Sequence, residues 1–84
     1  MNKRWKDEAW EDYVAWQIED KKTLKRINAL IKDIERNGAM NGIGKPERLK
    51  YGVGYSRRID DANRLVYDID IHGYLYIISC KGHY

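Results

Sequence analysis

Phenylalanine is absent from the 84-residue sequence, cysteine occurs once, and no apolar run reaches the length that would span a membrane. A lone cysteine cannot form an internal disulfide, and Cys80 lies in a strand-like segment. We therefore expect a core thiol in a cytoplasmic protein rather than a secreted, disulfide-bonded one. Three Trp and seven Tyr supply the aromatic area that Phe would otherwise bury. With an apolar content of 43%, this length predicts one domain, residues 1–84, around one small core.

Metal-ligand spacings and common catalytic groupings are missing as well. His72, in a turn-like segment, and His83, beside Tyr84, match no zinc spacing with Cys80, so no metal ion and no other cofactor is predicted. There is no nucleophile beside a base of the Ser-His-Asp kind. The glycine-rich segment that ends at Lys45 is too short for a phosphate-binding P-loop and is followed directly by proline.

The net charge of +3 is distributed unevenly. Residues 1–37 carry nine basic and eight acidic groups, whereas residues 45–58 carry five basic groups and one acidic group, Glu47. The five basic residues are Lys45, Arg48, Lys50, Arg57 and Arg58. Tyr51 and Tyr55 lie among them, and basic groups interleaved with aromatic rings suit a phosphate chain with exposed bases. An ordinary solvated loop explains the same composition equally well.

Apolar spacing predicts two consecutive helices. The first begins at Asp7, where acidic residues favour the positive end of the helix dipole, and continues to about Ile18. Its predicted apolar face consists of Trp10, Tyr13, Val14 and Gln17, with Trp16 off that face. The second helix is capped by Asp20 and ended by Gly38. Its predicted apolar face consists of Leu24, Ile27, Leu30, Ile31 and Ile34.

Alternation of apolar and polar residues predicts three antiparallel strands near residues 55–60, 64–70 and 74–80, and residues 1–6 form a weaker candidate for a short edge strand. Because the connection between the two helices is short, we expect them to be antiparallel. The predicted fold class is α+β: two antiparallel N-terminal helices packed on one face of a small antiparallel sheet. The other face of the sheet is left free to bind a ligand.

Period-two alternation places Leu65, Tyr67 and Ile69 on one face of a strand and Arg64, Val66 and Asp68 on the other. Whether Arg58 shares the face of Arg64 depends on the length of the connection between their strands, which the sequence does not fix. Two facing guanidinium groups would bind a phosphate between them, or each would pair with a nearby aspartate. Both interpretations stay open.

The remaining inventory is one carboxylate among basic groups, Glu47, together with several arginines and His83. These groups suit metal-free cleavage of RNA. In that reaction a base activates the substrate's own 2′-hydroxyl, cations stabilise the charged phosphorane, and an acid protonates the leaving 5′-oxygen.

Several segments, in this order along the chain, resemble the YoeB toxins of the RelE superfamily. They are Trp10-Glu11-Asp12-Tyr13, Ile27-Asn28-Ala29-Leu30-Ile31-Lys32-Asp33, Gly44-Lys45-Pro46-Glu47, Leu49-Lys50, Ser56-Arg57-Arg58-Ile59, Arg64-Leu65-Val66-Tyr67 and His83-Tyr84. The resemblance implies a microbial-RNase-like fold and a bacterial toxin of a type II toxin-antitoxin pair. The implied activity is cleavage of messenger RNA in the A site of the 70S ribosome. Dimerisation and neutralisation by a YefM-type antitoxin are implied too.

The same resemblance assigns roles to individual residues. It implies that Glu47 is the general base, Arg64 the arginine that stabilises the transition state, and His83 the general acid. Tyr84 matches the tyrosine that orients the substrate. Lys50 and Arg58 match basic residues near the scissile phosphate, and Arg57 and Lys45 of the basic segment are predicted to bind substrate with them.

Two other functions are weighed against the ribonuclease. A basic module that fills the ribosomal A site without cleaving RNA would use the surface of residues 45–58. A ParE-like toxin of the same superfamily would act on a topoisomerase instead, and Glu47 together with the His83-Tyr84 pair argues against that function.

Overall fold

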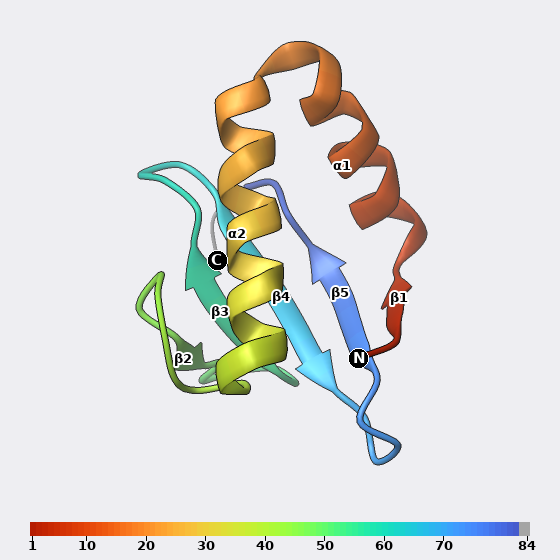
Figure 1. Cartoon of the computed structure of the whole chain (residues 1–84), viewed down its shortest axis with the longest axis vertical. Helices are drawn as coiled ribbons and strands as arrows, with labels where there is room; N and C mark the ends of the chain where they lie inside the picture. The colour runs from red at the N-terminus through yellow and green to blue at the C-terminus, as the bar shows by residue number, and fades with distance from the viewer. Residues whose placement is uncertain (83–84) are drawn as a thin grey trace.

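A five-stranded sheet organises the computed structural model, which describes residues 1–82, and two helices lie against one of its faces (Figure 1). The elements are β1 (Lys3–Trp5), α1 (Asp7–Glu19), α2 (Lys21–Asn37), β2 (Glu47–Arg48), β3 (Tyr55–Arg58), β4 (Arg64–Ile69) and β5 (Leu75–Ser79). The strand order is β1-β5-β4-β3-β2, and all neighbours are antiparallel except β1 and β5, which are parallel. The predicted α+β class, with two helices on a small sheet, is confirmed, and β2 is an addition to it.

The buried face of α1 differs from the prediction. Ala9 and Trp16 are buried, whereas Trp10 and Val14 remain 48% and 40% exposed. The indole N–H of Trp16 donates to the Cys80 carbonyl oxygen at 3.0 Å, which fixes this side chain under the end of β5. Trp10 instead packs at the surface against the ring of Trp5, with 5.5 Å between centroids. The helix carries two apolar stripes, and helical spacing alone does not say which one faces the core.

The second helix follows the prediction closely. Asp20 accepts hydrogen bonds from the backbone N–H groups of Lys22 and Thr23, and Gly38, at φ 88°, ends the helix. Ile27, Leu30, Ile31 and Ile34 are buried, and Leu24 is partly buried. This face packs on the sheet residues Leu65, Tyr67, Leu75 and Ile77 to form the core. Cys80 also lies in this core, as predicted, and burial raises the pKa of its thiol to about 12.

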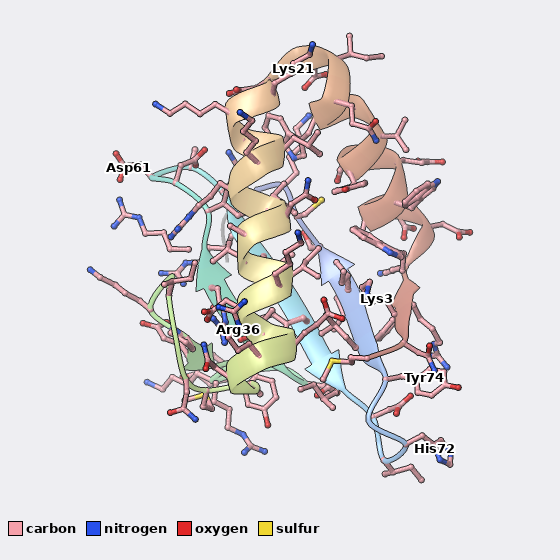
Figure 2. The ribbon with its side chains drawn as sticks, in the orientation of Figure 1. Lys3, Lys21, Arg36, Asp61, His72 and Tyr74 are labelled. Carbon is pink, nitrogen blue, oxygen red and sulfur yellow. The ribbon has the colours of Figure 1, made fainter. Side chains whose placement is uncertain are left out.

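The faces of the sheet determine which side chains are free to act. The Cα partners Arg57 and Leu65 face the helices, while the neighbouring partners Arg58 and Arg64 face the other side. Figure 2 shows His72 in the exposed turn between β4 and β5. Of the helices described within residues 1–82, none has the length and apolarity needed to cross a membrane.

Candidate functional site: a carboxylate and an arginine on the open face of the sheet

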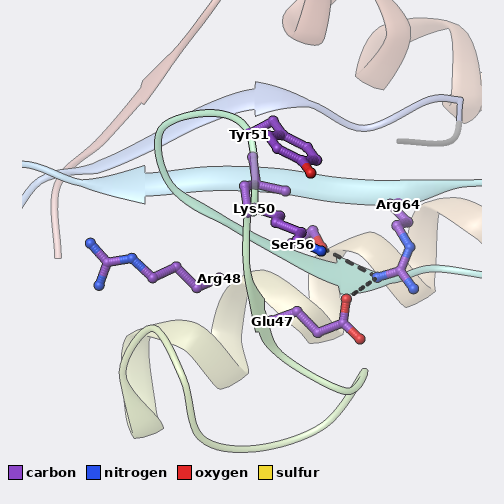
Figure 3. A pocket seen from close by; sticks show the side chains of 7 residues that line it. Glu47, Arg48, Lys50, Tyr51, Ser56 and Arg64 are labelled. Carbon is purple, nitrogen blue, oxygen red and sulfur yellow. Dashed lines mark hydrogen bonds and ion pairs between the residues drawn. The ribbon is translucent and has the colours of Figure 1, made fainter.

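A hollow of about 290 Å³ lies on the sheet face opposite the helices (Figure 3). Its lining residues are Glu47, Arg48, Leu49, Lys50, Tyr51, Ser56 and Arg64. They come from β2, from the loop that follows it, from the second residue of β3 and from the first residue of β4. The pairing of Glu47 with Ser56 across β2 and β3 brings the carboxylate onto the same face as Arg64. Among residues 1–82, the lining thus comes from one stretch of the chain, residues 47–64.

Arg64 lies between two oxygen acceptors at the centre of the hollow. Its Nη1 donates to Ser56 Oγ at 3.2 Å and lies 3.8 Å from Glu47 Oε2 (Figure 3). The Arg64 side chain is 18% exposed and that of Glu47 is 61% exposed, while Ser56 is buried. The guanidinium is therefore held in place at the base of the hollow, and the carboxylate stays accessible to a ligand. A proton acceptor beside a fixed cation is suited to reactions in which negative charge develops on a bound anion.

The rim of the hollow is basic and aromatic. Lys50 Nζ lies 5.7 Å from the centre of the Tyr51 ring, and that ring is 91% exposed. Arg48 contributes to the lining, but its guanidinium extends away from Glu47 and Arg64, toward the ring of Tyr55 at 5.8 Å (Figure 3). An exposed phenol ring next to an ammonium group can stack on a nucleotide base while the cation contacts phosphate.

Arg58 and Lys45 lie outside the hollow. Arg58 is the Cα partner of Arg64, so the two arginines share one face of the sheet, which settles the question that the sequence left open. Arg58 forms an ion pair with Asp61, a residue of the β3–β4 connection labelled in Figure 2. Lys45 is exposed, with a positive φ of 50°, and only Pro46 separates it from β2. The structure thus gathers Glu47, Lys50 and Arg64 in one hollow and leaves Arg58 and Lys45 beside it.

Arg57 requires a correction. We predicted that it binds substrate, but its side chain is fully buried on the helix-facing side of the sheet and forms an ion pair with Asp33. Strand alternation is the physical reason, because neighbours along β3 point to opposite faces. The hydrogen bond from Arg57 holds the pKa of the Asp33 carboxyl below its ordinary value. Arg57 is therefore part of the protein interior and does not line the hollow.

His83 and Tyr84, predicted as catalytic residues, lie outside the described residues. The residue before them in the sequence, Gly82, is hydrogen-bonded next to the hollow. Its carbonyl oxygen accepts from the backbone N–H of Arg64 at 2.9 Å, and its own N–H donates to Asn63 Oδ1 at 2.9 Å. The chain is thus tied to the first residue of β4 two positions before its last residue.

Four lining residues of the hollow were not among the predicted site residues: Arg48, Leu49, Tyr51 and Ser56. Ser56 supplies the hydrogen-bond acceptor for Arg64, and Tyr51 supplies an exposed ring. Tyr51 had a signal in the sequence, since it lies among the basic residues of the segment 45–58. Ser56 had none, because its contribution depends on the register between β3 and β4. Within residues 1–82 there is no group of three His, Cys, Asp or Glu side chains placed to hold a metal ion.

Comparison with known proteins gives consistent matches along the chain. The family model described as "YoeB-like toxin of bacterial type II toxin-antitoxin system" matches residues 5–84. The toxin YoeB of Escherichia coli (strain K12) is 45% identical over 82 residues, which cover 95% of each sequence. A structure of the YoeB dimer from Staphylococcus aureus is 51% identical, with a TM-score of 0.92, and the match covers 100% of this chain and 98% of that one. The heterotetrameric YoeB-YefM toxin-antitoxin complex from the same organism contains a chain that is 51% identical, with a TM-score of 0.90 and the same coverage.

Proposed function

Because the chain belongs to the family of YoeB-like toxins of bacterial type II toxin-antitoxin systems, we propose that it is an endoribonuclease that cleaves messenger RNA in the A site of the 70S ribosome. The observation that carries this proposal is the hollow in which an exposed carboxylate, Glu47, lies 3.8 Å from the guanidinium of Arg64. Cleavage of ribosome-bound messenger RNA would inhibit translation, and the proposed location of the protein is accordingly the cytoplasm.

In the proposed reaction the 2′-hydroxyl of the substrate is the nucleophile. The Glu47 carboxylate accepts the proton of this hydroxyl, and the resulting oxygen attacks the adjacent phosphorus. Arg64 stabilises the negative charge that develops on the phosphorane, and His83 donates a proton to the leaving 5′-oxygen. The products are a 2′,3′-cyclic phosphate and a 5′-hydroxyl. Base, cation and acid are all side chains of this protein, so the proposal assigns no step to a metal ion.

The other predicted residues have binding roles in this proposal. Lys50 and Arg58 contact the phosphates that flank the cleaved bond, and Lys45, exposed just before β2, extends the basic surface. Tyr84 orients the nucleotide at the cleaved bond. The ribosome would supply the rest of the substrate geometry, and a reaction that depends on such positioning is slow on free RNA.

Partners follow from the family as part of the same proposal. The YoeB relative from Staphylococcus aureus forms a heterotetrameric toxin-antitoxin complex with YefM, and a YefM-type antitoxin would bind and neutralise this protein. A homodimer is proposed because a relative of nearly the same length and fold forms a YoeB dimer. Both partners would bind to the toxin, whereas the ribosome would present the substrate.

The proposal is tested by primer extension on a defined messenger held in purified 70S ribosomes with an empty A site. Wild type should cleave within the A-site codon, and Glu47→Ala and His83→Ala should each be slower by roughly 10²- to 10⁴-fold, the usual contribution of a general base or acid. Glu11→Ala, which removes an exposed carboxylate from α1, is the matched control and should cleave like wild type. Stalled ribosomes that carry an intact messenger would refute cleavage and favour the module that blocks the A site.

A further inference from the structure

The guanidinium of Arg57 has a hydrogen-bond acceptor for every one of its N–H groups. Its Nε donates to the Tyr67 hydroxyl at 2.9 Å, and one Nη1 donor reaches the Asp33 carboxylate. The other three donors reach backbone carbonyl oxygens at 2.7–2.9 Å, those of Gly38, Asn41 and Ile43. An arginine has five N–H donors, so this buried cation is fully satisfied. Three of its five acceptors belong to a single loop, the segment 38–45 between α2 and β2.

The loop is in turn shaped around this arginine. The Tyr67 hydroxyl donates to the Ala39 carbonyl oxygen at 2.6 Å, and Asp33 accepts from the backbone N–H of Ile43 at 3.0 Å. Gly42 has a φ of 117°, and a Cβ placed on it would lie 1.8 Å from the Asp33 carboxylate. This loop conformation thus requires both the positive φ and the missing side chain of glycine.

The loop leads directly to Glu47. Its next-to-last residue, Gly44, accepts a hydrogen bond from the Arg58 backbone N–H at 2.7 Å, and only Lys45 and Pro46 separate it from Glu47. β2 itself has two residues, whose only described sheet neighbour is β3. So short a strand cannot fix the direction of an exposed side chain alone, and the anchored loop before it supplies the missing restraint.

We propose that Arg57, with Asp33 and Tyr67, is a positioning residue that acts through Glu47: it fixes the loop 38–45 and thereby holds the Glu47 carboxylate next to Arg64. The inference rests on the proposed ribonuclease function and adds a role for residues that do not touch the substrate. A purely structural ion pair would stabilise the fold without any particular effect on Glu47. The two roles predict different results once Glu47 is replaced by alanine. If the network acts by positioning Glu47, disrupting it then slows cleavage no further; if it only stabilises the fold, disrupting it slows cleavage as much as before.

Tyr67→Phe is the test variant, since it removes one hydroxyl from the network and keeps the ring. Tyr55→Phe is its matched control: Tyr55 packs on Tyr67 with 5.8 Å between ring centroids, and within residues 1–82 its hydroxyl forms no hydrogen bond. Tyr67→Phe removes two hydrogen bonds, the one that the hydroxyl accepts from Arg57 and the one that it donates to Ala39. In amide hydrogen exchange, the variant should accelerate exchange of the Ile43 and Arg58 amides at least roughly tenfold relative to amides in the middle of α2, the order expected for this loss. Unchanged exchange at these two amides, or equal acceleration in Tyr55→Phe, would overturn the inference.

Single-turnover cleavage in the ribosome assay supplies the second measurement. Tyr67→Phe should lower the cleavage rate constant roughly tenfold at an unchanged half-saturating concentration, and should cause no further loss when Glu47 is already alanine. The same fractional loss in both backgrounds would show a general structural effect and refute the positioning role. Absence of cleavage by the wild type would instead refute the proposed function. The two failures are therefore distinct.

Discussion

Removal of the Ser56 hydroxyl should slow RNA cleavage while the fold stays intact. Within residues 1–82, Ser56 Oγ is the hydrogen-bond acceptor nearest to the Arg64 guanidinium, at 3.2 Å, and the Glu47 carboxylate is farther away, at 3.8 Å. In Ser56→Ala, Arg64 keeps only the longer of these two contacts, and its side chain can rotate away from the position where the phosphorane forms. The variant leaves every proposed acid, base and cation in the chain.

The size of the effect follows from the burial of the two partners. A hydrogen bond to a charged group contributes about 1.5–3 kcal/mol. The Arg64 side chain is 18% exposed, so water replaces part of the lost bond, and we expect a loss of about 1–2 kcal/mol in transition-state stabilisation. At a tenfold change in rate for every 1.4 kcal/mol or so, cleavage should be roughly 5- to 30-fold slower.

The assay is single-turnover cleavage on 70S ribosomes, combined with thermal unfolding. Ser56→Ala should lower the rate constant without raising the half-saturating concentration, and its unfolding midpoint should fall by no more than about 4–8 °C, which corresponds to 1 kcal/mol in a domain of this size. Thr23→Val is the control, because it removes a buried hydroxyl in the first turn of α2, at the opposite end of that helix from the loop 38–45. Cleavage by Ser56→Ala at the wild-type rate, or an equal slowing in Thr23→Val, would refute this account of Arg64.

Three further outcomes are expected. Glu47→Ala, at a side chain that is 61% exposed, should leave the free energy of unfolding in urea within about 0.5 kcal/mol of wild type even though cleavage is slowed strongly. A large loss of stability would contradict the assignment of Glu47 to the open hollow. The Arg57 hydrogen bond lowers the pKa of Asp33 in the folded state. The ionised carboxylate therefore stabilises the fold fully at pH values above its unfolded pKa of about 4, and this stabilisation is lost as the pH falls through the lower folded pKa. Urea midpoints measured from pH 6 to pH 2 should therefore fall less steeply in Asp33→Asn. Cys80, with a pKa of about 12 and no exposed surface, should react with an aromatic disulfide reagent at pH 8 only after denaturant is added.

Features that depend on local sequence were predictable. The bounds of α2 follow from a capping aspartate, Asp20, and a terminal glycine, Gly38, whose effects act within a few residues. The faces of β4 follow from period-two alternation, and the structure confirms them, with Leu65 and Tyr67 in the core cluster. Glu47 and Arg64, chosen on chemistry and resemblance, do lie in one hollow. Their catalytic roles stay predictions until the cleavage assays are done.

Features that depend on packing between distant segments were not predictable. Trp10 and Trp16 are chemically identical, and the buried one, Trp16, is the one that packs in the core and donates to the Cys80 carbonyl oxygen, 64 positions along the chain. The two-residue strand β2 has no pattern of its own and exists because β3 pairs with it. Ser56 belongs to the site only through the register that faces it toward Arg64. In each case the deciding partner lies outside the local sequence.

Three arginines of similar sequence context show how strand geometry assigns function. Arg57 and Arg58 are adjacent, so their side chains point to opposite faces of the sheet, Arg57 into the core and Arg58 onto the open face. A buried guanidinium is tolerable only with a full set of hydrogen-bond acceptors, which Arg57 has. Arg58 and Arg64 then share that face as direct partners, and two guanidinium groups at this spacing repel each other. Asp61 neutralises Arg58, whereas among residues 1–82 the acceptors of Arg64 are a serine hydroxyl and a carboxylate 3.8 Å away. Within residues 1–82, Arg64 is thus the least compensated of these three arginines and the one among them that lines the hollow, where an anionic ligand would complete its coordination.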